Sequence, residues 1–341
     1  MDKKIKALIV TGPTATGKTS VAVRLARTFK GQIISADSRQ VYKGLDIGTG
    51  KDLNEYSAGG LPVPFHLIDI VSPDEDYNLL RFCQDASAAI KDISLAGEVP
   101  IIAGGTPLYL HALISGYTLP GTPPDHSFRN SLLEKSPGQL SQMLKDSDPA
   151  AYEKLEQKLN RTRLVRAIEK ARNPVQEKLF LPLENIEFLV MGTFYPRPDV
   201  RARIRARLES RLAVGMLDEV SSLHKNGLSW ERLEYFGLEY RWLARHLQGQ
   251  MSYKEMLEGL YIKICDFAKS QDVWFRKMER EGVSIHWFRP LEEAGHIEQL
   301  AEDFLADRPL PAPLRRMSEI HYGPMSSIPP THKNALLELH K

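Results

Sequence analysis

The sequence predicts an α/β fold, a P-loop NTPase-like parallel sheet flanked by helices and interrupted by a helical insertion. Three observations predict it. Short apolar runs alternate with helical patterns up to about residue 116, as in a parallel sheet. The first run leads into Gly-x-x-x-x-Gly-Lys-Thr over residues 12–19, and a helical pattern follows. From about 117 to 185 the strand pattern stops and charged helical patterns replace it.

The loop over residues 12–19 is typical of a phosphate-binding loop. Gly12 and Gly17 allow the backbone N–H groups to converge on one anion, and the following helix adds the positive end of its dipole. We expect Lys18 to contact the terminal phosphate and Thr19 to offer its hydroxyl to Mg²⁺. A glycine turn that matches by chance is the alternative, which the flanking strand and helix disfavour. The predicted phosphate-site residues are Gly12, Pro13, Thr14, Ala15, Thr16, Gly17, Lys18 and Thr19.

Composition limits the classes of function. The net charge of the 341 residues is +2, so any nucleic-acid surface is a local patch rather than a general polycation. Cys83 and Cys265 are in no metal or redox spacing, which favours a reduced compartment, the cytoplasm. No apolar run approaches the roughly 18 residues of a membrane span, so we expect no membrane partner.

Polar residues follow three of the predicted strands. Ligands of parallel sheets bind at the carboxyl ends of the strands, so Asp37, Asp69 and Thr106 are expected to gather beside the phosphate loop. Asp37 could bind Mg²⁺, accept a proton or cap a helix. Thr106 could donate to a leaving-group oxygen or cap a helix. The strands are predicted over residues 7–10, 32–35, 65–68 and 100–103, with later strands at 186–194 and 283–288.

The predicted organisation has three parts. Residues 1–118 and 186–307 form the catalytic core with C-terminal helices, 119–185 form a helical insertion without strands, and 308–341 form a disordered, proline-bearing tail. Apolar residues at i, i+4 spacing predict one helix over 199–226. Two basic groups, around 161–172 and 201–211, are either solvated helix faces or a wall for phosphates.

Six segments together resemble the tRNA dimethylallyltransferase (tRNA isopentenyltransferase) family. The block Ser-Ala-Asp-Ser-Arg-Gln after a phosphate loop is the most specific of them. The resemblance covers about residues 5–290 and continues more weakly through 203–220 and 268–276. The six segments are residues 12–19, 35–42, 48–51, 66–69, 104–109 and 163–169.

The resemblance implies a reaction and its catalytic residues. The family moves a dimethylallyl group from dimethylallyl diphosphate to the exocyclic amine of the adenosine just 3′ of the tRNA anticodon. The phosphate loop then holds a diphosphate rather than ATP, and Asp37 takes the proton from the amine. Lys18, Mg²⁺ on Thr19, and Thr106 would neutralise the leaving group, with Arg203 and Arg207 adding to them.

The resemblance also implies a macromolecular partner, the tRNA anticodon stem-loop, which would lie between the sheet and the insertion. The target base must leave its stack to reach the site. We expect a monomer. The residues on tRNA-contacting stretches are Asp37, Ser38, Arg39, Gln40, Arg161, Arg163 and Arg166.

The chain departs from the family pattern mainly in its C-terminal third. Gly50 stands where the family usually has Ala, Glu239 where it has Lys, and Asp272 where it has Leu. These changes leave three alternatives open beside tRNA prenylation. They are prenyl transfer to a free adenine nucleotide, a P-loop kinase or NTPase that binds ATP, and a non-catalytic paralogue. Intact Lys18 and Asp37 disfavour the last, and the sequence presents no adenine pocket or lid arginines for a kinase.

Overall fold

The computed structural model describes residues 4–117, 119–120, 125–172, 178–180 and 182–320. The chain divides into two compact units at Ser115/Gly116 and at Pro182/Leu183. We call them the core unit (up to 115 and from 183) and the insertion unit (116–182), and each is described by itself.

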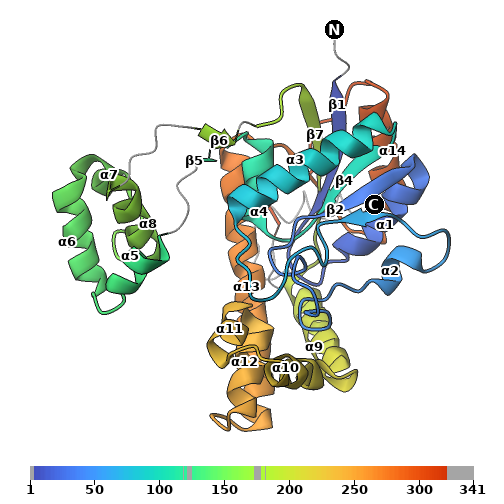
Figure 1. Cartoon of the computed structure of the whole chain (residues 1–341). Coiled ribbons are helices and arrows are strands. Elements are labelled where there is room, and N and C mark those ends of the chain that lie inside the picture. Colours follow the sequence, from blue (N-terminus) through green and yellow to red (C-terminus); the bar gives the residue numbers. More distant parts are fainter. Residues whose placement is uncertain (1–3, 118, 121–124, 173–177, 181, 321–341) are drawn as a thin grey trace, which may run out of the picture. The chain divides into compact units, whose positions relative to one another are not determined.

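The core unit contains a parallel six-stranded sheet, which confirms the predicted fold class (Figure 1). β1 lies at its centre between β4 and β7, and its residues Ala7, Leu8, Ile9 and Val10 are fully buried. A strand covered on both faces has to be apolar throughout, which is why the alternation expected of a half-exposed strand is absent. In spatial order the strands are β3 (Phe65–His66), β2 (Gly31–Ser35), β4 (Val99–Ala103), β1 (Ile5–Thr11), β7 (Ile186–Thr193) and β8 (Ile285–Phe288).

Helices cover both faces of the sheet. On one face, Leu8 and Val10 pack in one apolar cluster with residues of α1 (Lys18–Phe29) and α14 (Ala294–Leu305). The second face carries α3 (Leu79–Leu95), and α4 (Pro107–Ile114) packs between α3 and α13 (Tyr253–Arg280). The carboxyl edge of the sheet therefore lies between two layers of helices.

A second group of helices packs around α13. The single helix predicted over 199–226 is wrong, because Gly215 adopts φ +102 between α9 and α10. Its apolar stripe is nevertheless buried, from Val200 to Val220. The group comprises α9 (Arg197–Ala213), α10 (Met216–Lys225), α11 (Trp230–Tyr235) and α12 (Leu238–Leu247), and α2 (Asn54–Ser57) lies apart near α1.

The sequence predicts an extended or disordered tail from residue 308; residues 308–320 contain no helix or strand, and they pack against the rest of the core unit. Met317 is fully buried, and its backbone N–H donates to the Glu279 carboxylate at 3.0 Å. Arg315 donates to Glu293 at 3.0 Å. The remainder of that predicted tail, 321–341, lies outside the described residues.

The insertion unit is a small helical bundle with its own apolar cluster, which includes Leu140, Leu144, Leu164 and Ile168. The prediction that it contains no strand is wrong, since β5 (Leu119–Pro120) and β6 (Lys178–Phe180) pair antiparallel. A two-residue strand carries too little sequence pattern to be recognised. The helices are α5 (His126–Ser131), α6 (Pro137–Ser147), α7 (Pro149–Lys154) and α8 (Arg161–Arg172).

A buried carboxylate, Glu169, ties α5 to α8 in the insertion unit. It accepts two hydrogen bonds from Arg129, at 2.9 and 2.8 Å, one from Arg166 at 2.7 Å and one from the Asp125 N–H at 2.7 Å. Burial by itself would raise the pKa of this carboxyl, but these hydrogen bonds outweigh burial and lower the pKa to about 2. The ionised form therefore stabilises the bundle.

This arrangement predicts how the insertion unit responds to acid. Because the folded pKa of Glu169 lies below its usual value, its contribution is fully present above about pH 4.5 and is lost as the pH falls towards 2. Pepsin cleavage within residues 125–172, mapped by mass spectrometry, should rise across this window in the wild type. Glu169→Gln should unfold the unit more readily even at neutral pH, by on the order of 3 kcal/mol.

The exposed Glu153, paired with Lys158 in the same unit, provides the matched control. Glu153→Gln should behave as the wild type at every pH. Equal pepsin sensitivity of Glu169→Gln and wild type at pH 5 would contradict the role of Glu169.

Candidate active site

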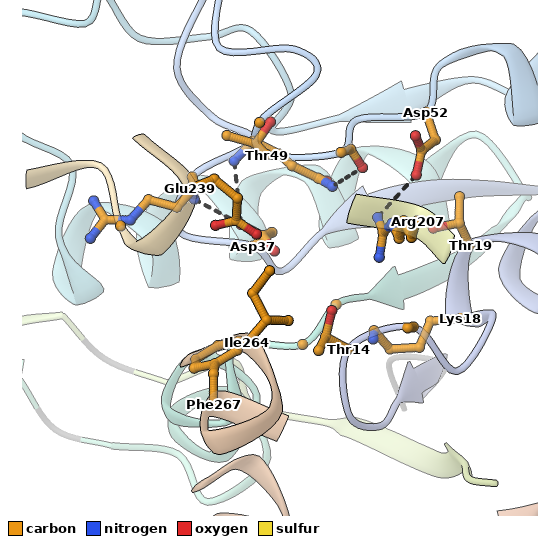
Figure 2. Close-up of a pocket in the computed structure, with 18 of the residues that line it drawn as sticks. Thr14, Lys18, Thr19, Asp37, Thr49, Asp52, Arg207, Glu239, Ile264 and Phe267 are labelled. Atoms are coloured by element: carbon orange, nitrogen blue, oxygen red, sulfur yellow. Dashed lines mark hydrogen bonds and ion pairs between the residues drawn. The ribbon is translucent and has the colours of Figure 1, made fainter. Parts of the chain in front are cut away.

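A cavity of about 600 Å³ opens at the carboxyl edge of the sheet, within the core unit (Figure 2). Its walls come from the segments that follow β1, β2 and β4, and from α9, α13 and the start of α12. Parallel sheets collect ligands at this edge, because the loops after the strands converge there.

The phosphate loop forms one end of the cavity. A Cβ at Gly12 would overlap the Thr193 carbonyl oxygen, so only glycine fits at this position, where φ is +144. The Thr16 hydroxyl bonds the Pro13 carbonyl and the Thr193 hydroxyl, both at 2.7 Å. Gly12, Pro13 and Thr16 therefore set the shape of the loop without lining the cavity themselves. The predicted residues that line the cavity are Thr14, Ala15, Gly17, Lys18 and Thr19.

Gln271, on α13, fastens the phosphate loop to the loop after β4. Its Oε1 accepts from the Thr14 N–H at 2.9 Å, and its Nε2 donates to the Gly105 carbonyl at 2.6 Å. The side chain is buried, so both hydrogen bonds are protected from water. Sequence reasoning did not assign Gln271 to the site, although it lies in a segment that carries the family resemblance.

Lys18 carries the central cation of the site. Its Nζ donates to the Pro13 carbonyl at 2.7 Å. Burial and, to a smaller extent, the charge of Arg207 lower the pKa of the ammonium to about 7, and Asp37 opposes both effects.

Asp37 and Thr106 lie together in the cavity wall, as predicted. Asp37 Oδ1 accepts from the backbone N–H groups of Arg39 at 2.8 Å and Gln40 at 3.3 Å, which caps a turn rather than a helix. Thr106 Oγ1 accepts from the Ser38 N–H at 3.2 Å. In the described part of the chain, no group hydrogen-bonds to Asp37 Oδ2, so that oxygen can meet a ligand.

Asp69 does not join them, contrary to expectation. Its carboxylate pairs with Lys51, which is buried and also bonds Asp46 at 2.5 Å and the Tyr42 carbonyl at 2.8 Å. Lys51 thus holds the segment after β2 in place, and Asp69 serves that segment instead of the cavity.

Three arginines of α9 supply further positive charge. Arg203 donates to the Ala15 carbonyl at 3.0 Å, while Arg207 and Arg211 donate to Asp52 Oδ2 at 3.0 and 3.4 Å. A Cβ at Gly50 would overlap the Arg211 guanidinium. Arg203 and Arg207 are predicted site residues; Arg211 is not, although its i+4 spacing from Arg207 places it on the same helix face.

Part of the cavity wall is apolar. Ile264 and Phe267 come from α13, and Phe236 and Leu238 flank Gly237 at the start of α12. The cavity therefore joins a cationic anion cradle to a wall that suits a short hydrocarbon group. At its edge, the Arg39 guanidinium lies 4.9 Å from the centre of the Tyr235 ring.

The predicted RNA-binding arginines of the insertion unit differ in their availability. Arg161 donates to the carbonyls of Leu132 at 2.5 Å and Leu133 at 2.8 Å, so its guanidinium holds the bundle together. Arg166 bonds the buried Glu169. The side chain of Arg163 is 42% exposed, which makes it the best placed of the three to meet a phosphate.

Comparison with known proteins assigns a family to this architecture. The family model for IPP transferase matches residues 40–278, and that for isopentenyl transferase matches residues 5–59. A tRNA dimethylallyltransferase 1 of Syntrophus aciditrophicus is 46% identical, over 86% of this chain and 96% of that protein. A tRNA dimethylallyltransferase 2 of Shewanella sediminis is 45% identical, over 89% and 99%. The chain belongs to the tRNA dimethylallyltransferase family.

Solved structures agree with this membership. The full-length tRNA isopentenylpyrophosphate transferase from Bacillus halodurans superposes with a TM-score of 0.64 at 28% identity, covering 89% of this chain and 96% of that one. A eukaryotic dimethylallyltransferase acting on tRNA shares the fold, with a TM-score of 0.73 at 22% identity. Within the described ranges, every helix is too short or too polar to cross a membrane.

The departures from the family pattern have identifiable partners in the structure. The space above Gly50 is taken by Arg211, as described above. Asp272 pairs with Arg197 at 3.0 Å, and both side chains are largely buried. Arg197 thus neutralises the negative charge of Asp272 on α13, and Asp272 does not line the cavity.

The pKa of Lys18 predicts a pH dependence for anion binding. Only the ammonium form attracts a diphosphate, and its population falls as the pH rises above about 7. The affinity of the wild type for inorganic diphosphate should therefore weaken between pH 7 and 9, by up to about tenfold per unit. Isothermal titration calorimetry measures this directly.

Lys18→Met provides the reference, because the ionisation of diphosphate itself affects both proteins equally. The variant should bind more weakly and lose the part of the pH dependence that Lys18 contributes. Parallel pH profiles for the two proteins would show that Lys18 does not titrate in this range.

Proposed function

We propose that this chain transfers the dimethylallyl group of dimethylallyl diphosphate to the exocyclic N6 amine of the adenosine 3′ of the tRNA anticodon. The products are N6-isopentenyladenosine in the tRNA and diphosphate. One observation carries the proposal: in a member of this family, a single cavity combines the cationic cradle with the Asp37 carboxylate and an apolar wall. The names of the relatives favour tRNA as the acceptor over a free adenine nucleotide, and favour prenyl transfer over a kinase activity.

The cationic cradle serves the leaving group. As the amine nitrogen bonds to the first prenyl carbon, the bond from that carbon to the diphosphate oxygen breaks and the oxygen gains charge. Lys18 and Arg207, together with the backbone N–H groups of the phosphate loop, stabilise that charge where it develops. Arg203 and the Thr106 hydroxyl lie in the same cavity and can contact the departing phosphate oxygens.

Mg²⁺ fits this cradle as a companion of the diphosphate. Among the described residues, no three His, Cys, Asp or Glu side chains form a metal cluster. Mg²⁺ commonly binds phosphate oxygens and water with only one or two protein ligands, and the Thr19 hydroxyl faces the cavity as such a ligand. When bound, the ion would add positive charge to the leaving diphosphate.

Asp37 serves the acceptor. An adenine amine is a weak nucleophile because its lone pair is delocalised into the ring, so it must lose a proton as the new bond forms. The free Oδ2 of Asp37 can accept that proton, while Oδ1 stays bonded to the turn and fixes the carboxylate. The apolar wall with Ile264 and Phe267 would exclude water, which could otherwise attack the prenyl carbon.

The acceptor adenosine has to leave the anticodon-loop stack to reach Asp37. Arg39 and Gln40 follow Asp37 in the cavity wall and could bind the RNA backbone beside the extruded nucleotide. Arg163, in the insertion unit, is proposed to bind a phosphate further along the stem-loop. The expectations of a monomer and of a cytoplasmic enzyme remain part of this proposal.

Replacing Asp37 separates the proposed base from the anion cradle. Asp37→Asn retains an oxygen for the turn N–H groups but cannot take a proton. Its kcat should fall by about 10²- to 10⁴-fold, measured as isopentenyladenosine formed in an anticodon stem-loop RNA. Affinity for diphosphate should stay within about threefold of the wild type. Loss of both quantities together would contradict the role of a base.

Salt dependence tests the contact with RNA. Each phosphate contact contributes about one unit to the slope of log affinity against log salt concentration. Arg163→Ala should weaken stem-loop binding and reduce that slope by about one, as measured by fluorescence anisotropy. Lys4→Ala serves as the control, because Lys4 is half-exposed and precedes β1, at the edge of the sheet away from the cavity. Identical slopes for both variants and the wild type would exclude this contact.

A further inference from the structure

A carboxylate, Asp52, lies in the wall of the cationic cradle and pairs with two of its arginines. Its Oδ2 accepts from Arg207 at 3.0 Å and from Arg211 at 3.4 Å. Figure 2 shows Asp52 and Arg207 pointing toward each other, at the end of the cavity where Thr19 lies. The mechanism proposed above gives Asp52 no part, although its side chain lines the cavity assigned to the diphosphate.

The backbone around Asp52 is fixed independently of these two hydrogen bonds. Lys51, the residue before it, is buried and donates to the Tyr42 carbonyl at 2.8 Å. On the other side, the Asp52 carbonyl accepts from the Glu55 N–H at 2.9 Å, at the start of α2. The loop therefore keeps its shape whichever partner the Asp52 carboxylate has.

The pairing of Asp52 with the arginines is weak enough to be exchanged. The Asp52 side chain is 40% exposed, so water can solvate its carboxylate when an arginine leaves it. Ion pairs that are this exposed stabilise little, because water and salt screen them. A diphosphate carries several negative charges and attracts the same guanidinium groups more strongly than one carboxylate does. The arginines can therefore pass from Asp52 to a diphosphate and back.

The chemistry of the reaction gives this exchange a use. When the prenyl carbon leaves, the oxygen that bonded it becomes a charged terminal oxygen, so the diphosphate product is more negative than the donor. On charge alone, the cradle would bind its product more tightly than its substrate. A carboxylate that competes for the same arginines weakens this binding, and the product leaves faster.

We propose that Asp52 is an internal competitor of the diphosphate: it yields Arg207 and Arg211 to the donor and takes them back as the diphosphate product leaves. This inference rests on the proposed function, because it concerns how the same site binds and releases its diphosphate. Asp52 acts through the two arginines, and it is thus a positioning residue rather than a catalytic one.

The direction in which Asp52→Asn changes diphosphate affinity tests the proposal. Asparagine removes the charge, keeps the shape of the side chain and tolerates the left-handed backbone at this position, where φ is +45. If Asp52 competes, the variant should bind inorganic diphosphate about 10-fold more tightly than the wild type, as measured by isothermal titration calorimetry. If Asp52 only held the arginines in place, the variant would bind more weakly. Weaker or unchanged binding would overturn the proposal.

Glu209 provides the matched control. It is an exposed carboxylate on α9 that pairs with Arg205 at 2.5 Å and does not line the cavity. Glu209→Gln removes the same charge from the same region and should bind diphosphate as the wild type does.

A double-mutant cycle shows whether Asp52 acts through the arginines. The gain from Asp52→Asn should shrink to about threefold or less in an Arg207→Gln background, because one of the two contested groups is then missing. An undiminished gain there would mean that the charge of Asp52 acts on the diphosphate directly, which contradicts competition for the arginines.

Mg²⁺ separates competition from metal binding, since the Asp52 carboxylate could instead bind the ion that accompanies the diphosphate. The titrations are therefore made both in EDTA and in Mg²⁺, and the tighter binding of Asp52→Asn should appear in both. Weaker binding confined to Mg²⁺ would assign Asp52 to the cation and overturn the proposal.

Product inhibition supplies the second readout, with an anticodon stem-loop RNA as acceptor. Diphosphate should inhibit Asp52→Asn at a concentration about 10-fold lower than it inhibits the wild type. Equal inhibition of the two proteins would overturn the role of Asp52 and leave prenyl transfer intact. Absence of transfer by the wild type would overturn the proposed function, whereas the calorimetric comparison, which uses no acceptor, would still report on Asp52.

Discussion

The site depends on holding several cations in one buried cavity before any anion arrives. Burial is the larger cause of the lowered pKa values of Lys18 and Arg211, and repulsion from the charge of Arg207 lowers both further. The carboxylate of Asp52 offsets part of this repulsion by accepting from both arginines. A diphosphate can replace that carboxylate as their partner and supplies more negative charge. The same repulsion that disfavours the empty cradle therefore favours the bound one.

Such a cradle needs rigid support, and polar side chains that hydrogen-bond to the surrounding loops provide it. Glu219 accepts from the N–H groups of Asp46, Ile47 and Gly48, at 3.0, 2.6 and 3.1 Å, and from the Tyr240 hydroxyl at 2.6 Å. It thereby anchors the segment before Gly50 to α10 and α12. Lys51 anchors the same segment to the end of β3, and Gln271 joins the loops after β1 and β4. These contacts fix the groups that bind the anion, which is how a site is pre-organised.

The features of the site that could be predicted from the sequence are those that short sequence segments determine. The phosphate loop, and the meeting of Asp37 with Thr106, follow from strand order in a parallel sheet. Arg211 shares the helix face of Arg207 and could have been included on spacing, whereas the position of Glu239 depends on how α12 packs against α10 and α13. Asp69 has the pattern of a site acid, but a distant lysine, Lys51, captures it. Sequence spacing alone cannot show which carboxylates the buried Lys51 pairs with.

The basic residues of the insertion unit illustrate the same limit. Arg161, Arg163 and Arg166 have similar sequence surroundings, yet Arg161 bonds backbone carbonyls and Arg166 bonds a buried carboxylate. Arg163 is exposed and forms a long ion pair, at 3.9 Å, with the exposed Glu156. A guanidinium has several donors and can hydrogen-bond to any nearby acceptor, so tertiary packing determines which partner each arginine has. Charge clusters in a sequence therefore identify candidates, and the structure separates structural arginines from those available to RNA.

Two departures from the family pattern, Gly50 and Glu239, line the cavity, whereas Asp272 pairs with Arg197 and does not line it. A lysine at position 239, as in the family pattern, would add another cation beside Arg207 and Arg211. With Arg211 filling the space above Gly50, that arrangement would place three positive groups together with only Asp52 to offset them. A neutral or negative side chain at 239 avoids this repulsion. Gly50, Arg211 and Glu239 are thus physically coupled: an alanine at 50 would displace Arg211, whose charge acts on the carboxyl of Glu239.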